Sequence, residues 1–217
     1  MTATTILFDL DGTLIDSTDA ILESFHTSFK QCNFSSPDDT AIKSLIGHTL
    51  EDMYLQLGVP KEEHQRIIAA YKEHYRQISR AQTLLLPYAK EALEAAKTFA
   101  TLGVVTTKTK RYSLELLEHL GILDYFTSII GREDVQNPKP HPEPVLKAIA
   151  MLHAEKASTW MVGDTILDIQ SANQAGIQSC AVLCGYGMRE DLEQQTSHIS
   201  QHSHDAVQLI LRNSNLL

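Results

Sequence analysis

From Leu84 onward, segments with helical periodicity alternate with short apolar segments, and this alternation restricts the possible folds more than any other feature. We expect helices over Pro87–Phe99, Lys110–Leu120, Pro142–His153 and Ile166–Ala175, and strands over Leu102–Thr106, Phe126–Ile130, Thr159–Val162 and Gln178–Leu183. Asp205 and Gln208 resemble the capping box of a terminal helix. Strand–helix repetition favours a parallel sheet with right-handed crossovers that place helices on both faces. The predicted fold class is α/β, a Rossmann-like parallel sheet flanked by helices.

Residues 16–80 differ from the rest, because they show helical periodicity and almost no strand signal. Apolar residues recur at helical spacing in two stretches, Leu22, Phe25 and Phe29, and Ile67, Tyr71, Tyr75 and Ile78. Two shorter helices are expected between them, over Pro37–Ile46 and Thr49–Leu57. Four helices form a small bundle. We therefore predict a helical cap of residues 16–80, inserted after the first strand of a core made of residues 1–15 and 81–217.

Composition and charge narrow the possible partners. A chain of 217 residues with 43% hydrophobic content suits one domain, or a core with a smaller insert. A formal net charge of -9 opposes binding to nucleic acid or to anionic membranes, whereas small anionic metabolites stay possible. The sequence shows no apolar run of membrane-spanning length and no signal-peptide pattern, so we expect a cytoplasmic protein. It leaves a monomer and a homodimer equally open.

The first predicted strand, around Ile6–Phe8, ends at two carboxylates, Asp9 and Asp11, which are followed by Gly12. Residues i and i+2 of a strand point to the same side. At about 4 Å and an effective dielectric near 20, two such charges repel by roughly 4 kcal/mol. A bound cation, or a proton on one carboxylate, relieves this repulsion. On this fragment alone, an acidic cap on the next helix is the alternative interpretation.

Polar residues of complementary charge also follow the other predicted strands. In open parallel sheets, ligands bind beyond the carboxyl ends of the strands. The residues expected there are Asp9, Asp11, Thr106, Thr107, Lys108, Lys139, Asp164 and Asp168. This set indicates a site for phosphate and a metal ion. Each residue also has an ordinary structural interpretation, such as a helix cap for Thr106 or Thr107, a solvated loop charge for Lys139 and a first-turn acid for Asp168.

The order of these residues resembles a known family. Asp9-Leu10-Asp11-Gly12-Thr13, Thr106 at a strand end, the isolated Lys139 and Gly163-Asp164-x-x-x-Asp168 resemble, in order, the four motifs of the haloacid dehalogenase superfamily. The resemblance covers essentially the whole chain, and the helical insert resembles the caps of phosphoglycolate phosphatase-like and beta-phosphoglucomutase-like members. The residue after the motif threonine is often asparagine in relatives and is Thr107 here, which keeps the main-chain donor.

The resemblance implies a phosphoric monoester hydrolase that forms an aspartyl-phosphate on Asp9, with Asp11 as the acid and then the base. It implies a metal site made by the side chains of Asp9 and Asp164 and the main-chain carbonyl of Asp11, with Asp168 completing or orienting the shell. All-oxygen ligation favours Mg²⁺. The implied phosphate contacts are the Thr106 hydroxyl, the Lys139 ammonium and the main-chain N–H groups of Leu10, Asp11 and Thr107. Lys108 is interpreted as a charge that steers anions.

The substrate is expected to be a small phosphorylated metabolite, chosen by the cap. His48 and Thr49, in the turn after Gly47, are candidate substrate contacts, although a surface or capping role is an equal alternative for His48. Related sugar phosphomutases commonly carry an arginine in this turn and this chain does not, which favours a phosphatase over a beta-phosphoglucomutase-type mutase. An inorganic pyrophosphatase, a nucleotide phosphatase and a non-catalytic binding or regulatory protein stay open. His198, His202 and His204 are predicted to lie in a solvated loop.

Overall fold

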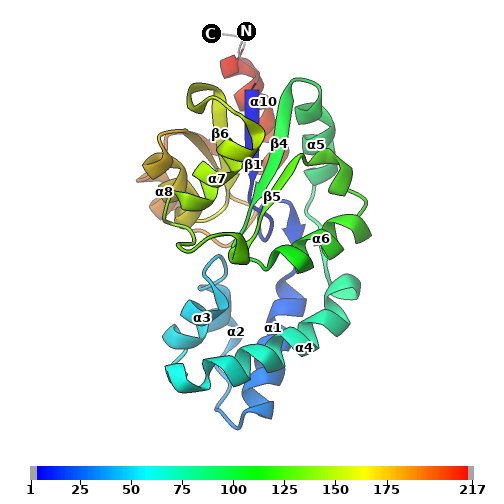
Figure 1. Ribbon diagram of the computed structural model, residues 1–217, viewed down its shortest axis with the longest axis vertical. Helices are drawn as coiled ribbons and strands as arrows, with labels where there is room; N and C mark the ends of the chain where they lie inside the picture. Colours follow the sequence, from blue (N-terminus) through cyan, green and yellow to red (C-terminus); the bar gives the residue numbers. More distant parts are fainter. Residues whose placement is uncertain (1–3, 215–217) are drawn as a thin grey trace. The chain divides into compact units, whose positions relative to one another are not determined.

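A computed structural model describes residues 4–214, which divide into two compact units (Figure 1). The core unit ends its first part at Asp16 and resumes at Leu85, and the cap unit is Ser17–Leu84. The cap unit ends later than the predicted residue 80, because the last cap helix continues to Gln82. No helix of residues 4–214 combines the length and apolar character needed to span a membrane.

The core unit is built on a six-stranded parallel sheet in the order β5-β4-β1-β6-β7-β8. Its strands are β1 (Thr4–Phe8), β4 (Ala100–Val105), β5 (Ser128–Ile130), β6 (Thr159–Gly163), β7 (Gln178–Val182) and β8 (Ile199–Ser200). β1 lies in the middle, and its residue Phe8 is in register with Val104 of β4 on one side and with Val162 of β6 on the other. The chain extends the sheet from β1 to β5 and then returns to the other side of β1. The order therefore reverses beside β1, where ligands bind in such sheets.

Helices cover both faces of this sheet (Figure 1). They are α5 (Ala89–Lys97), α6 (Lys110–His119), α7 (Glu143–Leu152), α8 (Ile166–Ala175), α9 (Arg189–Glu193) and α10 (Ser203–Ser214), with 3-10 turns at Leu123–Tyr125, Arg132–Asp134 and Lys156–Ser158. Successive strand residues point to opposite faces. Accordingly, Ile6 and Phe8 pack with residues of α5, α6 and α10, whereas Leu7 packs with α7 and α8. The predicted α/β class with a parallel sheet is confirmed.

The segment between Leu183 and the terminal helix differs from its predicted structure. It contains α9 and β8, which the sequence did not indicate because two strand residues leave no readable periodicity. The predicted solvated loop is wrong for the histidines, since the His198 ring lies 5.1 Å from the Trp160 ring and the His202 ring 4.4 Å from that of Tyr88. α10 begins at Ser203, so the predicted capping box is also wrong and Asp205 lies in the first turn.

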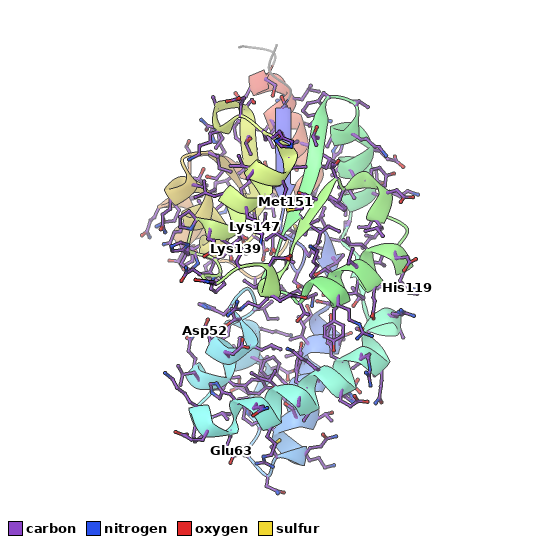
Figure 2. All side chains as sticks on the ribbon, viewed as in Figure 1. Asp52, Glu63, His119, Lys139, Lys147 and Met151 are labelled. Carbon is purple, nitrogen blue, oxygen red and sulfur yellow. The ribbon has the colours of Figure 1, made fainter. Side chains whose placement is uncertain are left out.

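The cap unit holds α1 (Thr18–Gln31), α2 (Asp39–Lys43), α3 (Leu50–Gln56), a 3-10 turn (Lys61–Glu63) and α4 (His64–Gln82). Figure 2 labels Asp52 on α3 and Glu63 just before α4. The interior is aromatic, and its rings belong to Phe25, Phe29, Tyr54, Tyr71 and Tyr75. The Tyr54 hydroxyl, which is the polar end of this buried ring, shares a hydrogen bond of 2.6 Å with the Ser28 hydroxyl. β2 (Ile15–Asp16) and β3 (Leu84–Leu85) form a separate two-stranded sheet.

Candidate active site

The chain turns sharply where β1 ends, and this turn carries the paired aspartates. The carbonyl of Leu10 accepts N–H groups from Thr13, Leu14 and Ile15, at 3.1, 2.9 and 3.0 Å. Gly12 has a φ of +85°, and a Cβ there would lie 2.3 Å from Oδ2 of Asp164. Only glycine combines this left-handed conformation with so close an approach. The turn thus places Asp9, whose main-chain N–H donates to the Val162 carbonyl at 2.9 Å, beside the end of β6, and it brings Gly12 against Asp164.

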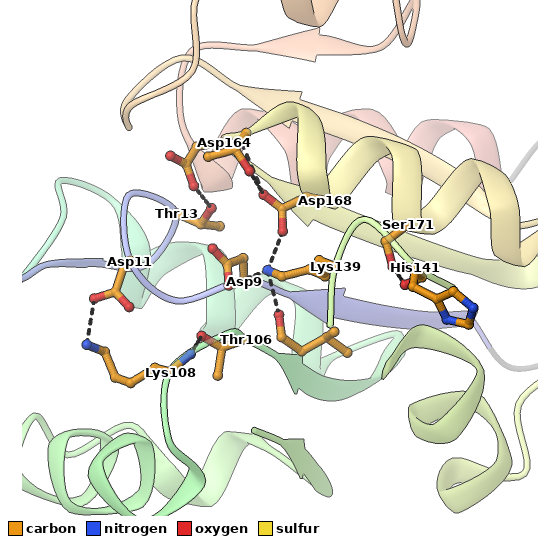
Figure 3. Close-up of polar contacts among 12 residues, drawn as sticks. Asp9, Asp11, Thr13, Thr106, Lys108, Lys139, His141, Asp164, Asp168 and Ser171 are labelled. Carbon is orange, nitrogen blue, oxygen red and sulfur yellow. Dashed lines mark hydrogen bonds and ion pairs between the residues drawn. The ribbon is translucent and has the colours of Figure 1, made fainter. Parts of the chain in front are cut away.

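Lys139 lies at the centre of the site (Figure 3). Its Nζ donates to Oδ1 of Asp9 at 2.8 Å, to Oδ1 of Asp168 at 2.5 Å and to the Val105 carbonyl at 3.2 Å. Lys139, Asp9 and Asp168 are all buried. Burial alone would lower the pKa of Lys139, but the charges of Asp168 and Asp9 outweigh it and raise that pKa. Lys139 is therefore a buried cation paired with two carboxylates and not a solvated loop charge.

Asp164 and Asp168 are held in fixed orientations after β6. Oδ1 of Asp164 accepts the Thr13 hydroxyl at 2.9 Å, and Oδ2 accepts the main-chain N–H of Tyr186 at 2.8 Å. Oδ2 of Asp168 accepts the N–H and the hydroxyl of Thr165, at 3.1 and 2.8 Å. Because Oδ1 of Asp168 is bound to Lys139, both of its oxygens have partners in the protein.

The site contains more buried negative charge than its buried lysine can neutralise. Burial raises the pKa of Asp9 to about 7, while the attraction of Lys139 opposes this rise. Burial, followed by repulsion from Asp168 and Asp9, raises the pKa of Asp164 well above its ordinary value. Carboxylate oxygens of these three aspartates lie within 4.8 Å of one another. A divalent cation would relieve the repulsion, and an all-oxygen donor set suits Mg²⁺, so the residues fit the predicted metal.

Thr106 and Lys108 extend the site from the end of β4 (Figure 3). The Thr106 side chain is buried, and its Oγ1 accepts the main-chain N–H of Lys108 at 3.1 Å. This contact curls the chain back after the strand. Nζ of Lys108 lies 3.3 Å from Oδ1 of Asp11. The sequence indicated only a role in steering anions for Lys108 and did not predict this ion pair.

The two predicted cap contacts belong to the other unit. Thr49 is the N-cap residue of α3, where its Oγ1 accepts the N–H of Asp52 at 3.2 Å and donates to Oδ2 of Asp52 at 2.7 Å. This cap accounts for Thr49 through helix geometry alone. His48 lies in the turn just before it. Substrate contact by His48 or Thr49 stays a prediction.

Comparison with known proteins identifies the family. The model of the haloacid dehalogenase-like hydrolase family matches residues 6–182. The chain belongs to this family. It is 37% identical over 183 residues to the pyrophosphatase PpaX of Oceanobacillus iheyensis, with 84% of each chain covered. It is 30% identical over 209 residues to a phosphoglycolate phosphatase of Salmonella typhi, covering 85% of this chain and 83% of the relative.

A crystal structure named for a haloacid dehalogenase-like hydrolase from Bacteroides fragilis has the same fold, with a TM-score of 0.89 at 28% identity. The match covers 94% of this chain and 100% of that one. Together with the family match, these relatives make the chain an enzyme, a hydrolase of the phosphatase type.

In this haloacid dehalogenase-like hydrolase, sequence reasoning missed the groups that orient Asp164. Thr13 belongs to the first motif, but the sequence pattern gives it no role of its own. Tyr186 acts through its main-chain N–H, which leaves no trace in its side-chain type. The sequence feature that could have indicated this contact is the pair of glycines, Gly185 and Gly187, on either side of Tyr186. A Cβ on Gly185 would lie 2.1 Å from Oδ2 of Asp164. Such an approach requires glycine.

Proposed function

We propose that this hydrolase is a Mg²⁺-dependent phosphatase that hydrolyses a small, phosphoglycolate-like phosphate monoester through an aspartyl-phosphate on Asp9. The observation that carries the proposal is the position of Lys139, paired with Asp9 and Asp168 at the carboxyl edge of the sheet. Asp164 lies in the same cluster. A nucleophilic carboxylate, a buried cation and an oxygen-rich metal site are the parts that phosphoryl transfer requires.

Two displacements at phosphorus complete the reaction. The reaction starts with Asp9 ionised and a proton on Asp11. An oxygen of Asp9 attacks phosphorus, and the bond from phosphorus to the leaving oxygen breaks while Asp11 gives that oxygen its proton. Asp11 then takes a proton from water as the water oxygen attacks phosphorus. The bond from phosphorus to Asp9 breaks, inorganic phosphate leaves and both aspartates regain their starting states.

Charge and hydrogen bonds lower the barrier to both displacements. The ammonium of Lys139 neutralises charge on Asp9 and on the phosphoryl oxygens. The hydroxyl of Thr106 donates to a phosphoryl oxygen, and the main-chain N–H groups of Leu10, Asp11 and Thr107 supply further donors. Removing one such donor from a preorganised site typically slows catalysis by about 10²–10³-fold.

The metal would be held by the side chains of Asp9 and Asp164 and by the main-chain carbonyl of Asp11. Asp168 completes or orients this shell, and its oxygens also bind Lys139 and Thr165. When bound, Mg²⁺ supplies positive charge that neutralises the phosphoryl oxygens and orients them for attack.

An inorganic pyrophosphatase is the second candidate, supported by the 37% identity to a protein of that name. The same residues would act in the same order, with phosphate in place of an alcohol as the leaving group. A nucleotide phosphatase also fits this chemistry. A mutase is disfavoured because the Gly47–Leu50 turn of the cap has no arginine for a second phosphate.

A substrate screen tests the proposal. Purified protein is assayed with phosphoglycolate, pyrophosphate, sugar phosphates and nucleotides, each with Mg²⁺ and with EDTA, beside an Asp9→Asn variant. We expect Mg²⁺-dependent phosphate release that is highest for phosphoglycolate and absent in the variant. Highest release from pyrophosphate would instead support the second candidate. Equal release from wild type and variant would overturn the role of Asp9.

A further inference from the structure

The ion pair between Lys108 and Asp11 lies on the side of the site that Lys139 does not occupy (Figure 3). Lys139 contacts Asp9, the proposed nucleophile. Lys108 contacts Asp11, the residue that gives its proton to the leaving oxygen in the mechanism proposed above. The two lysines therefore contact different members of the aspartate pair.

We propose that Lys108 binds an anionic group on the leaving group and thereby selects substrates that carry a second negative charge close to the scissile oxygen. This assignment rests on the proposed function and names its substrate class. The carboxylate of a 2-hydroxy acid and the second phosphate of a diphosphate both meet the requirement, because both place an anionic oxygen two or three bonds from the leaving oxygen.

The distances permit this contact. A hydrogen bond from a carboxyl group to the leaving oxygen is about 2.7 Å long. Nζ of Lys108 lies 3.3 Å from Oδ1 of Asp11, so it falls within roughly 6 Å of a leaving oxygen bound there. An anionic oxygen two or three bonds further along the leaving group can then reach the ammonium directly. A leaving group with only neutral hydroxyls offers that ammonium no charge.

Lys139 is poorly placed for the same task. An ammonium group has three N–H donors. Those of Lys139 have acceptors on Asp9, Asp168 and Val105 inside the core, and its side chain is buried. The main-chain N–H of Lys108 donates to Oγ1 of Thr106 after β4, and the Lys108 side chain points toward Asp11. Of the two lysines, Lys108 is therefore the better placed to bind a charged leaving group.

The test compares substrates that differ in this one charge. The full chain is assayed with Mg²⁺ on phosphoglycolate, on pyrophosphate and on 2-hydroxyethyl phosphate, which replaces the carboxylate with a neutral CH₂OH group. The variants are Lys108→Gln, Lys108→Arg and the control Lys110→Gln, which removes a nearby lysine that pairs with Asp134. A hydrogen bond to a charged group contributes about 1.5–3 kcal/mol, which corresponds to about 10–100-fold in kcat/KM.

We expect Lys108→Gln to lower kcat/KM for an anionic substrate at least about ten-fold more than for 2-hydroxyethyl phosphate, with partial recovery in Lys108→Arg. Lys110→Gln should leave the ratio between the substrates as in wild type. A selective loss on phosphoglycolate identifies a carboxylate as the anion, and one on pyrophosphate identifies a phosphate.

Equal losses on all three substrates would overturn the assignment, because Lys108 would then act only through Asp11. Unchanged kcat/KM in Lys108→Gln would overturn it as well. A wild-type protein that hydrolyses none of the three would overturn the proposed function, and this assignment with it.

Discussion

Nζ of Lys139 lies 2.8 Å from Oδ1 of Asp9, and both side chains are buried, with exposed fractions of 1% for Lys139 and 5% for Asp9. The pair joins a residue after β1 to one that lies 130 positions later in the chain. Taking both charges out of water is costly, and the attraction between them offsets that cost only while both partners are present. The fold thus depends on the same contact that positions the proposed nucleophile.

Replacing Lys139 with methionine should destabilise the core unit. Asp9 and Asp168 would lose their shared cation, and breaking a buried pair typically costs about 3–5 kcal/mol. The free energy of unfolding should fall by about 3 kcal/mol near neutral pH when measured by urea denaturation in EDTA. Lys147→Met is the matched control, because Lys147 is an exposed lysine on α7 (Figure 2). Equal stability of the two variants would contradict a structural role for the buried pair.

Asp11→Asn should separate binding from turnover. The main-chain carbonyl of Asp11 is retained, so affinity for Mg²⁺ and for the phosphate analogue vanadate should stay close to wild type. The proton donor is lost, and kcat should fall by about 10²–10⁴-fold. Calorimetric titration and steady-state kinetics measure the two quantities, with the exposed Asp124→Asn as control. A normal kcat in Asp11→Asn would remove Asp11 from the acid–base role.

Stabilisation by Mg²⁺ should increase with pH. The pKa of Asp9 rises from 3.8 to about 7, mainly through burial, so the native protein binds a proton that the unfolded chain has released. Its contribution to stability is complete below the unfolded pKa and disappears as pH rises through about 7. Magnesium competes with this proton. The difference in Tm between Mg²⁺ and EDTA should therefore be larger near about pH 8 than near about pH 5.5.

Thermal unfolding at the two pH values, with and without Mg²⁺, measures this effect. In Asp9→Asn the titrating carboxyl is absent, so the pH dependence of the Mg²⁺ effect should weaken. A Tm difference that is larger at the lower pH would contradict the assignment of Asp9 to the metal site.

The sequence predicted the parallel sheet because β4, β6 and β7 are apolar segments framed by helices with clear periodicity. It indicated the residues Asp9, Thr106 and Asp164 because parallel strands present their carboxyl ends at one edge. Lys139 lies in the segment before a helix, and its role was implied by the family resemblance. The Tyr186 N–H and the pairing of Lys108 with Asp11 were not predictable. Main-chain donors carry no side-chain signature, and the direction of a long lysine side chain depends on packing that periodicity does not encode.

The formation of a covalent intermediate on Asp9 is the central claim, and chemical trapping tests it most directly. Borohydride reduces an acyl phosphate to an alcohol, so an aspartyl-phosphate becomes homoserine. The protein is mixed with substrate and Mg²⁺, treated with borohydride and analysed by peptide mass spectrometry, with a substrate-free sample as control. We predict homoserine at position 9 only in the sample with substrate. An unmodified Asp9 in protein that is turning over substrate, with homoserine at another aspartate, would contradict the account.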